Sequence, residues 1–172
     1  GSNGCNLALT QVEMFDNSVE TTTETGGHCP AIWVNGGTKH TLTDVSFHDN
    51  IGTFQSGVCI GATDEHLAFN ADTVQFYDNT SKGNGSSGAL YLFADSGGNI
   101  SADLVDTVLF DNQTPGTSSL SWVGGFYAAR GNIDIAWSKT SGADSGAYGN
   151  DQAGVVLQGD SISLSATDLD FG

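Results

Sequence analysis

Four aspartates recur at matching places in the chain and could together bind metal ions. Each directly precedes an asparagine, and the four are Asp16, Asp49, Asp78 and Asp111. Carboxylates stacked at the spacing of neighbouring β-strands, about 4.8 Å, repel one another by about 1 kcal/mol per pair in water. Rotamers that point into solvent would relieve this repulsion. A row of calcium ions would also relieve it, because calcium takes about six to eight oxygen ligands, so calcium at these four residues is a hypothesis.

Residues suited to acid–base catalysis are few and scattered. A lyase acting on acidic polysaccharide needs a cationic base. The candidates are Lys39, Lys82, Arg130 and Lys139. A hydrolase needs two carboxylates about 5 to 9.5 Å apart, a condition that 20 acidic residues meet too easily to be informative. No residue is therefore predicted to be catalytic, although a groove joining Arg130, Tyr127 and Trp122 would favour a carbohydrate-binding or polysaccharide-degrading protein.

Histidines and cysteines are the remaining candidate ligands. The histidines lack metal-ligand spacing and are expected at exposed strand edges or loops; they are His28, His40, His48 and His66. Cys29 and Cys59 each follow a repeated glycine by two residues, which predicts that they lie on adjacent coils. That spacing permits a disulfide, and a pair of buried thiols is the alternative. Cys5 would be left to bridge to another chain or to stay a free thiol.

Two markers with one period indicate the elements that position these residues. Phenylalanines close to the Asp-Asn step recur at steps of 32, 29 and 34 residues, at Phe15, Phe47, Phe76 and Phe110. Glycines that open short apolar segments recur at steps of 30, 31, 37 and 29, at Gly27, Gly57, Gly88, Gly125 and Gly154. A period near thirty is typical of repeats that bury their apolar faces by stacking, and the alternation of apolar and polar residues selects strands.

The fold predicted from this period is an all-β, right-handed, single-stranded parallel β-helix of about five to six coils. It would occupy residues 1–172 as one domain, either a segment of a longer solenoid or a unit that stacks on other copies, because neither end carries a capping helix. The predicted core comprises Leu9, Leu42, Phe69 and Leu104 together with a ladder of Phe15, Phe47, Phe76 and Phe110. A second structural ladder is predicted for the amides of Asn17, Asn50, Asn79 and Asn112.

The charge balance excludes several classes of partner. The chain has 4 Lys and Arg against 20 Asp and Glu, a formal net charge of −16. Such a surface repels phosphate backbones, so no nucleic acid is expected as a partner. No apolar run approaches the roughly 18 residues of a membrane-spanning helix. The abundance of Gly, Ser, Thr, Asn and Asp is typical of a turn-rich β protein.

A family resemblance extends these predictions towards function. The segments Phe47-His48-Asp49-Asn50 and Phe76-Tyr77-Asp78-Asn79, with Gly88-Ala89-Leu90 after the second, resemble the repeats of bacterial polymorphic outer-membrane proteins and related right-handed β-helix surface proteins. The resemblance implies an exported bacterial rod, extracellular or on the cell surface, used in adhesion or as a scaffold.

The functional hypothesis is a non-enzymatic structural, adhesive or filament-forming module. Its expected partners are other copies of itself or flanking coils of the same solenoid, and glycans or host cell-surface proteins. The alternative is a carbohydrate-binding or polysaccharide-degrading β-helix, with calcium as its candidate cofactor. Ice binding would need a regular Thr/Ser ladder, and the run Thr21–Thr23 has no copies in later coils.

Overall fold

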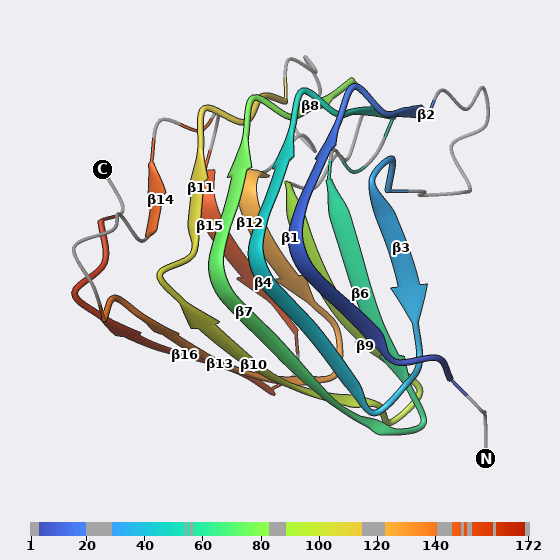
Figure 1. Ribbon diagram of the computed structural model, residues 1–172. Helices are drawn as coiled ribbons and strands as arrows, with labels where there is room; N and C mark the ends of the chain where they lie inside the picture. Colours follow the sequence, from blue (N-terminus) through green and yellow to red (C-terminus); the bar gives the residue numbers. More distant parts are fainter. Residues whose placement is uncertain are drawn as a thin grey trace.

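The computed structural model of the protein is a β-solenoid in which strands of successive coils pair in parallel (Figure 1). It describes residues 4–19, 29–53, 55, 57–82, 89–114, 123–140, 146–148, 150, 153–159 and 161–170. Every strand pair among these residues is parallel, and the partners lie about one coil apart in the sequence. The prediction of an all-β parallel solenoid is confirmed.

The largest of the three sheets, here the main sheet, has eight strands. Six of them follow one another along the axis, namely β1 (Leu7–Phe15), β4 (Lys39–His48), β7 (His66–Tyr77), β10 (Asn99–Val105), β13 (Asn132–Ser138) and β16 (Ser161–Thr167). The other two extend this sheet beyond a bend in the later coils, namely β11 (Val108–Phe110) and β14 (Gly146–Tyr148).

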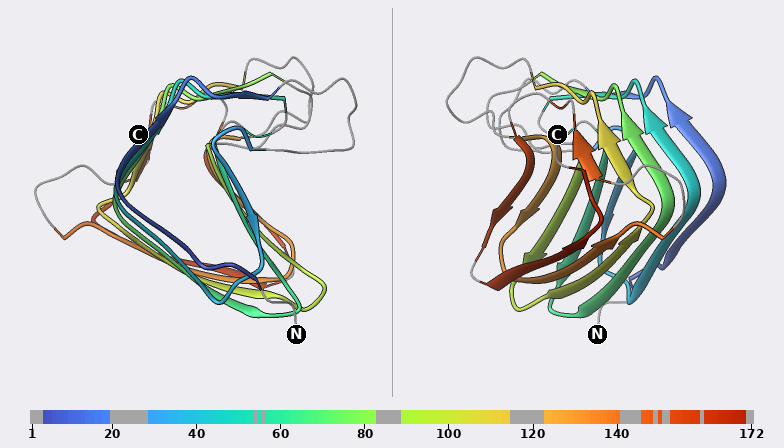
Figure 2. Two further views of the ribbon diagram at one scale, coloured as in Figure 1. Left: turned by 45° about the vertical axis from the view of Figure 1, so that its right-hand side comes forward. Right: turned by 90° about the vertical axis from the view of Figure 1, so that its left-hand side faces the viewer.

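Two smaller sheets close the coil. The second sheet has five strands, β3 (Ile32–Asn35), β6 (Val58–Thr63), β9 (Leu90–Asp95), β12 (Val123–Ala129) and β15 (Ala153–Gln158). The short sheet has three, β2 (Ser18–Val19), β5 (Ile51–Gly52) and β8 (Thr80–Ser81). In the left view of Figure 2, nearly along the axis, the successive coils superpose around a common interior.

The number of turns is lower than predicted. About four turns are present rather than five to six coils, because the five strands of the second sheet enclose four full circuits and β1 and β16 belong to incomplete ones. The sequence count took one coil for each of the five recurring glycines and added the last, incomplete stretch as a sixth.

Residues in the left-handed region make the bends of each coil. Gln11, Asp44 and Thr73 have φ of 55°, 52° and 56° and lie in register on β1, β4 and β7 of the main sheet. In the next coil Asp106, with φ of 45°, occupies the same position in the bend between β10 and β11. Asp is among the residues that tolerate this conformation best, because its short side chain bonds locally. Stacking of identical bends keeps the inward and outward faces in phase from coil to coil.

The interior is a continuous apolar core along the axis. Its largest fully buried side chains include Leu42, Leu67 and Phe69 in the first coils and Leu104 and Trp137 in the later ones. Leu9, predicted to be buried, is only partly so, because β1 has a neighbour on one side alone. None of the described residues forms a helix long and apolar enough to cross a membrane.

The predicted phenylalanine ladder is wrong in two of its four members. Phe47 and Phe76 are fully buried and stack with ring centroids 5.0 Å apart, but Phe15 is 50 % exposed and Phe110 is partly exposed. The strand register pairs Phe15 with His48 rather than with Phe47, so these side chains point outward.

The inner positions of those two coils hold other apolar residues. Met14 pairs with Phe47, and Leu109 pairs with Phe76. The inner column of the main sheet therefore runs through Met14, Phe47, Phe76 and Leu109.

Candidate functional site

The chain turns at the Asp-Asn step that follows the strands of the main sheet. The aspartate and asparagine side chains of this step point in opposite directions. The four aspartates have φ between 53° and 54° and are exposed, namely Asp16, Asp49, Asp78 and Asp111. The next residue in the middle coils is a fully buried asparagine, at Asn50, Asn79 and Asn112. The left-handed aspartate thus turns the chain so that a carboxylate faces solvent and an amide enters the core.

The asparagines form a directed amide ladder. The Asn79 side-chain amide donates to Oδ1 of Asn112 at 2.9 Å and to the Phe47 carbonyl at 2.9 Å. Its own Oδ1 accepts from the backbone and side-chain nitrogens of Asn50. The same pattern links Asn17 to Asn50. Every buried amide group in the ladder is therefore paired, which is the structural role predicted for these residues.

The ladder extends one coil further than the sequence indicated. Asn112 donates to Oδ1 of Asn150 at 2.9 Å, and Asn150 donates to the Leu109 carbonyl. The strand just before Asn150, β14, pairs with β11 and brings Tyr148 into register with Phe110. Glycine in place of aspartate at position 149 hid this copy of the motif.

The row of calcium ions at the four aspartates stays a prediction. Within the described residues, no three histidine, cysteine or acidic side chains converge in a way that could hold a metal ion. All four aspartates of the row belong to that part of the chain and point into solvent. Solvent therefore relieves their mutual repulsion.

An exposed stack of rings runs along the outside of the main sheet next to the aspartates. Here it is called the outer stack, and it comprises Phe15, His48, Tyr77 and Phe110. The ring centroids lie 5.2, 4.6 and 5.1 Å apart, with interplanar angles of 4°, 9° and 8°. Because the ring faces cover one another, only ring edges along the stack remain open to a ligand.

His48 is the polar member of the outer stack. Its Nε2 lies 2.9 Å from Oε1 of Glu13, and its Nδ1 lies 2.7 Å from Oδ2 of Asp49. Partial burial lowers the pKa of His48, but the hydrogen bonds to Asp49 and Glu13 outweigh it and raise the pKa above its ordinary value. Glu13 lies on β1, so His48 links the first coil to the second.

Of the other histidines that the structure describes, His40 differs from its predicted exposed position and His66 does not. His40 is fully buried, and its Nδ1 accepts a hydrogen bond from the Leu7 backbone while Nε2 donates to the Gly36 carbonyl. Burial lowers the pKa of His40. His66 is exposed, as expected, and His28 lies outside the described residues.

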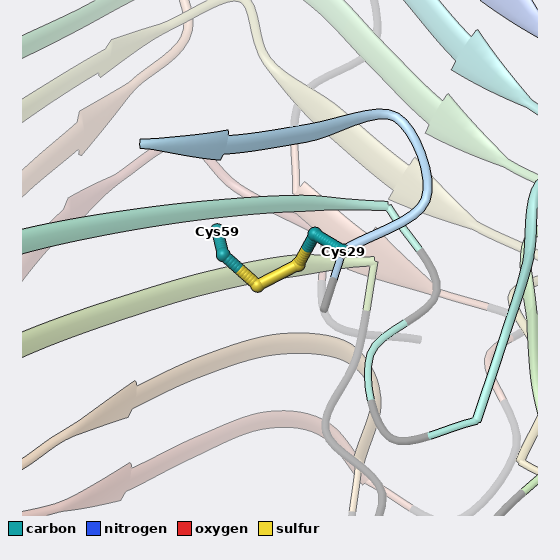
Figure 3. The surroundings of a disulfide bond; sticks show 2 residues. All are labelled: Cys29 and Cys59. Carbon is teal, nitrogen blue, oxygen red and sulfur yellow. A yellow bond between two sulfur atoms is a disulfide. The ribbon is translucent and has the colours of Figure 1, made fainter. Parts of the chain in front are cut away.

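A disulfide and an aromatic cluster lie on the outward face of the second sheet. Cys29 and Cys59 are bonded, with Cα atoms 5.8 Å apart, and join the first coil to the second (Figure 3). A small hydrophobic cluster forms around them with Tyr91, Phe93 and Ala129. Burial raises the pKa of Tyr91 to about 12. Cys5 is a free, exposed thiol.

The residues expected to mark a carbohydrate groove come together only in part. Tyr127 stacks on Tyr91 at 5.2 Å, and Arg130 donates to both carboxylate oxygens of Asp95 at 3.1 Å. The hydrogen bond to Asp95 raises the pKa of Arg130. Trp122 lies outside the described residues. Of the lysines, Lys39 begins β4, Lys82 follows β8 and Lys139 follows β13.

A hollow of about 500 Å³ lies on the outward face of β7, β10, β13 and β16. Among its lining residues are Asn70, Ser101, Asp103 and Asp134, and Ser163 donates to Oδ1 of Asp134 at 2.8 Å. The composition of the sequence gave no sign of this hollow, since its residues look like ordinary solvent-facing positions.

Ice binding gains no support from the same face. One outward column of the main sheet runs Thr10, Thr43, Asp72, Val105, Ser138 and Thr167. This mixture of residue types is not a regular Thr/Ser ladder. The run Thr21–Thr23 lies outside the described residues.

Exposed apolar side chains gather at the two ends of the solenoid. The exposed large hydrophobic residues of the described chain are Phe15 at 50 %, Trp33 at 44 % and Leu157 at 38 %. They belong to β1, β3 and β15, each of which is the terminal strand of its sheet.

Comparison with known proteins leaves the fold as the only classification. No family model, curated protein or solved structure matches the chain.

Proposed function

We propose that the protein is a non-enzymatic structural module of an exported, cell-surface or extracellular rod. In this proposal a further coil, from the same solenoid or from another copy, packs on the end strands. The observation that carries it is the position of the exposed apolar residues Phe15, Trp33 and Leu157, all on terminal strands.

The interior side chains of the end strands support the same proposal. On β1, Leu7 and Met14 pack against the core but stay partly exposed, and Ile162 and Leu164 do so on β16. Among the described strands, β1 pairs only with β4 and β16 only with β13, so each has one open hydrogen-bonding edge. An open edge of this kind readily pairs with another strand.

The Cys29–Cys59 disulfide supports the exported location. Disulfides persist in oxidising compartments and are rare in reducing ones. The winding is proposed to be right-handed, because parallel crossover connections are right-handed in about 98 % of cases. A right-handed winding also agrees with the resemblance to polymorphic outer-membrane protein repeats, which implies a rod used in adhesion or as a scaffold.

The test is to fuse a copy of residues 66–98, one middle coil, in front of β1. An added coil that buries the open end should raise the unfolding midpoint and the protection of β1 amides against hydrogen exchange. The matched control is the same fusion with its interior residues Leu67, Phe69 and Phe76 changed to serine, which should give no gain. Equal stability of the two fusions would contradict the proposal.

The filament version of the proposal is tested on the unmodified chain. Electron microscopy and sedimentation at rising protein concentration should show linear assemblies. Dispersed monomers at every concentration would contradict self-assembly. Flanking coils of the same solenoid would then be the proposed partner.

A second candidate function, carbohydrate binding or cleavage, is favoured by the hollow on the main sheet. Asp103 and Asp134 lie on adjacent strands there, among short polar side chains that could bond sugar hydroxyls. Turnover and binding assays on acidic and neutral glycans, with and without calcium, test this candidate. Asp103→Asn should abolish any activity found, and Asp64→Asn, at an exposed turn elsewhere, should not.

A further inference from the structure

The surroundings of His48 combine two ring contacts with two carboxylates. The imidazole lies between the rings of Phe15 and Tyr77, at 5.2 and 4.6 Å, and its side chain is 13 % exposed. In the plane of the ring, Glu13 contacts Nε2 and Asp49 contacts Nδ1. The ring is thus held on both faces and at both nitrogens.

These contacts fix the protonation state of the ring. A neutral imidazole carries one N–H, whereas an ionised carboxylate can only accept hydrogen bonds. Both contacts are satisfied together only when both nitrogens carry a proton, which makes His48 a cation. In the neutral form, one ring lone pair would face a carboxylate oxygen at less than 3 Å.

The charged and titratable groups around His48 act in the same direction. Glu13 faces it from β1, Asp49 follows it on its own strand, and Tyr77 stacks on it from β7. Asp16 and Asp78 occupy the same turn position as Asp49 in the neighbouring coils. The carboxylates favour the imidazolium, and Tyr77 is neutral because burial, with Glu13, Asp49 and Asp78 nearby, raises its pKa further above 10.0.

We propose that His48 is a pH-sensitive clasp that fastens the first coil to the second. While His48 is protonated, it binds Glu13. The outward-facing side chains of β1 are then held in place in addition to its backbone pairing with β4. Loss of the proton leaves one N–H for two carboxylates and removes the charge that attracts both, so the contact with Glu13 weakens and β1, with Phe15, opens more often. This inference goes beyond the proposed structural role and does not depend on it.

The direction of the effect follows from linkage. A histidine whose pKa is raised in the folded state contributes stability below its unfolded pKa and loses it as pH rises through the folded value. The raised pKa of His48 therefore places release of the clasp on the alkaline side of the ordinary histidine range.

The experiment measures local opening of β1 by hydrogen exchange across pH, corrected for intrinsic rates, alongside NMR titration of the histidines. The opening constant of amides near Phe15 should rise as His48 loses its proton, by about tenfold for each unit by which closing raises the pKa. His48→Phe keeps the ring stack without the charge and should open with no such pH dependence. A short peptide containing His48, free in solution, gives the reference titration.

Glu13→Gln provides the second variant, since it removes one carboxylate from an exposed position. It should lower the pKa of His48 and reduce the pH dependence of β1 opening. A His48 midpoint at or below that of the peptide, or equal pH dependence in the wild type and both variants, would overturn the proposal.

Discussion

The two ring columns of the main sheet differ by one residue in sequence and have opposite environments. Phe47 and Phe76 lie in the inner column and are fully buried, whereas Phe15 and Tyr77 lie in the outer stack and contact solvent. Successive side chains of a strand point to opposite faces, so a shift of one residue moves a ring from core to surface. The difference teaches that position relative to the left-handed aspartate, rather than residue type, decides burial.

The largest expected effect is the loss of an inner ring. Phe76→Ala removes a fully buried side chain from the middle of the solenoid and should cost about 3 to 5 kcal/mol in the free energy of unfolding. Phe15→Ala, at a half-exposed ring, should cost less than about 1 kcal/mol. Denaturant unfolding of both variants measures the contrast, and similar costs would remove the distinction between the columns.

The disulfide on the opposite side of the coil tests whether the first coil is held by more than the outer stack. Replacing both Cys29 and Cys59 by alanine opens a loop with a sequence separation of 30 residues. The chain-entropy model gives a loss of about 3 to 4 kcal/mol for such a loop. Thermal unfolding measures it, with Cys5→Ala as the control that should leave the midpoint unchanged. A loss below about 1 kcal/mol would show that the crosslink constrains little.

The amide ladder should show the same contrast between inside and outside. Asn79→Ala removes the donor to the Phe47 carbonyl and the acceptor of the two Asn50 nitrogens in the core and should cost about 2 to 3 kcal/mol. Asn17 is exposed, so Asn17→Ala should cost less than about 1 kcal/mol. Chemical denaturation of the two variants measures the loss in free energy of unfolding. Equal losses would mean that burial does not set the strength of the ladder.

The two histidines of β4 should give the smallest effects, with opposite signs. His40 is buried and its pKa is lowered, so its contribution is present above the ordinary value of 6.5 and is lost as pH falls below it. His48 has a raised pKa, so its contribution is lost as pH rises. Stability measured against pH should therefore lose its acid-side fall in His40→Gln and its alkaline-side fall in His48→Phe. Unchanged profiles would contradict both assignments.

The sequence predicted the winding well because the period is set by packing along the whole chain. Like residues must stack on like residues, and the repeated Asp-Asn step recorded that stacking. The sequence predicted less well which side chains of each strand point inward, because the phenylalanine of every repeat was expected to be buried. Counting back two residues from each aspartate identifies Met14, Phe47, Phe76 and Leu109 as the inner column without reference to aromaticity.

The contacts of the candidate site could not be predicted because they depend on side chains one coil apart. Glu13 lies 35 residues before His48 and two positions out of register with it, so no local motif joins them. The buried His40 was missed for the same reason, since its partner is a backbone amide of the previous coil, at Leu7.

The most direct test of the winding and its phase is NMR measurement of contacts between ring protons. The structure predicts contacts between Phe47 and Phe76, and separate contacts that link Phe15 to His48 and Tyr77 to Phe110. Contacts between Phe15 and Phe47, or backbone contacts of antiparallel type between β4 and β7, would contradict it.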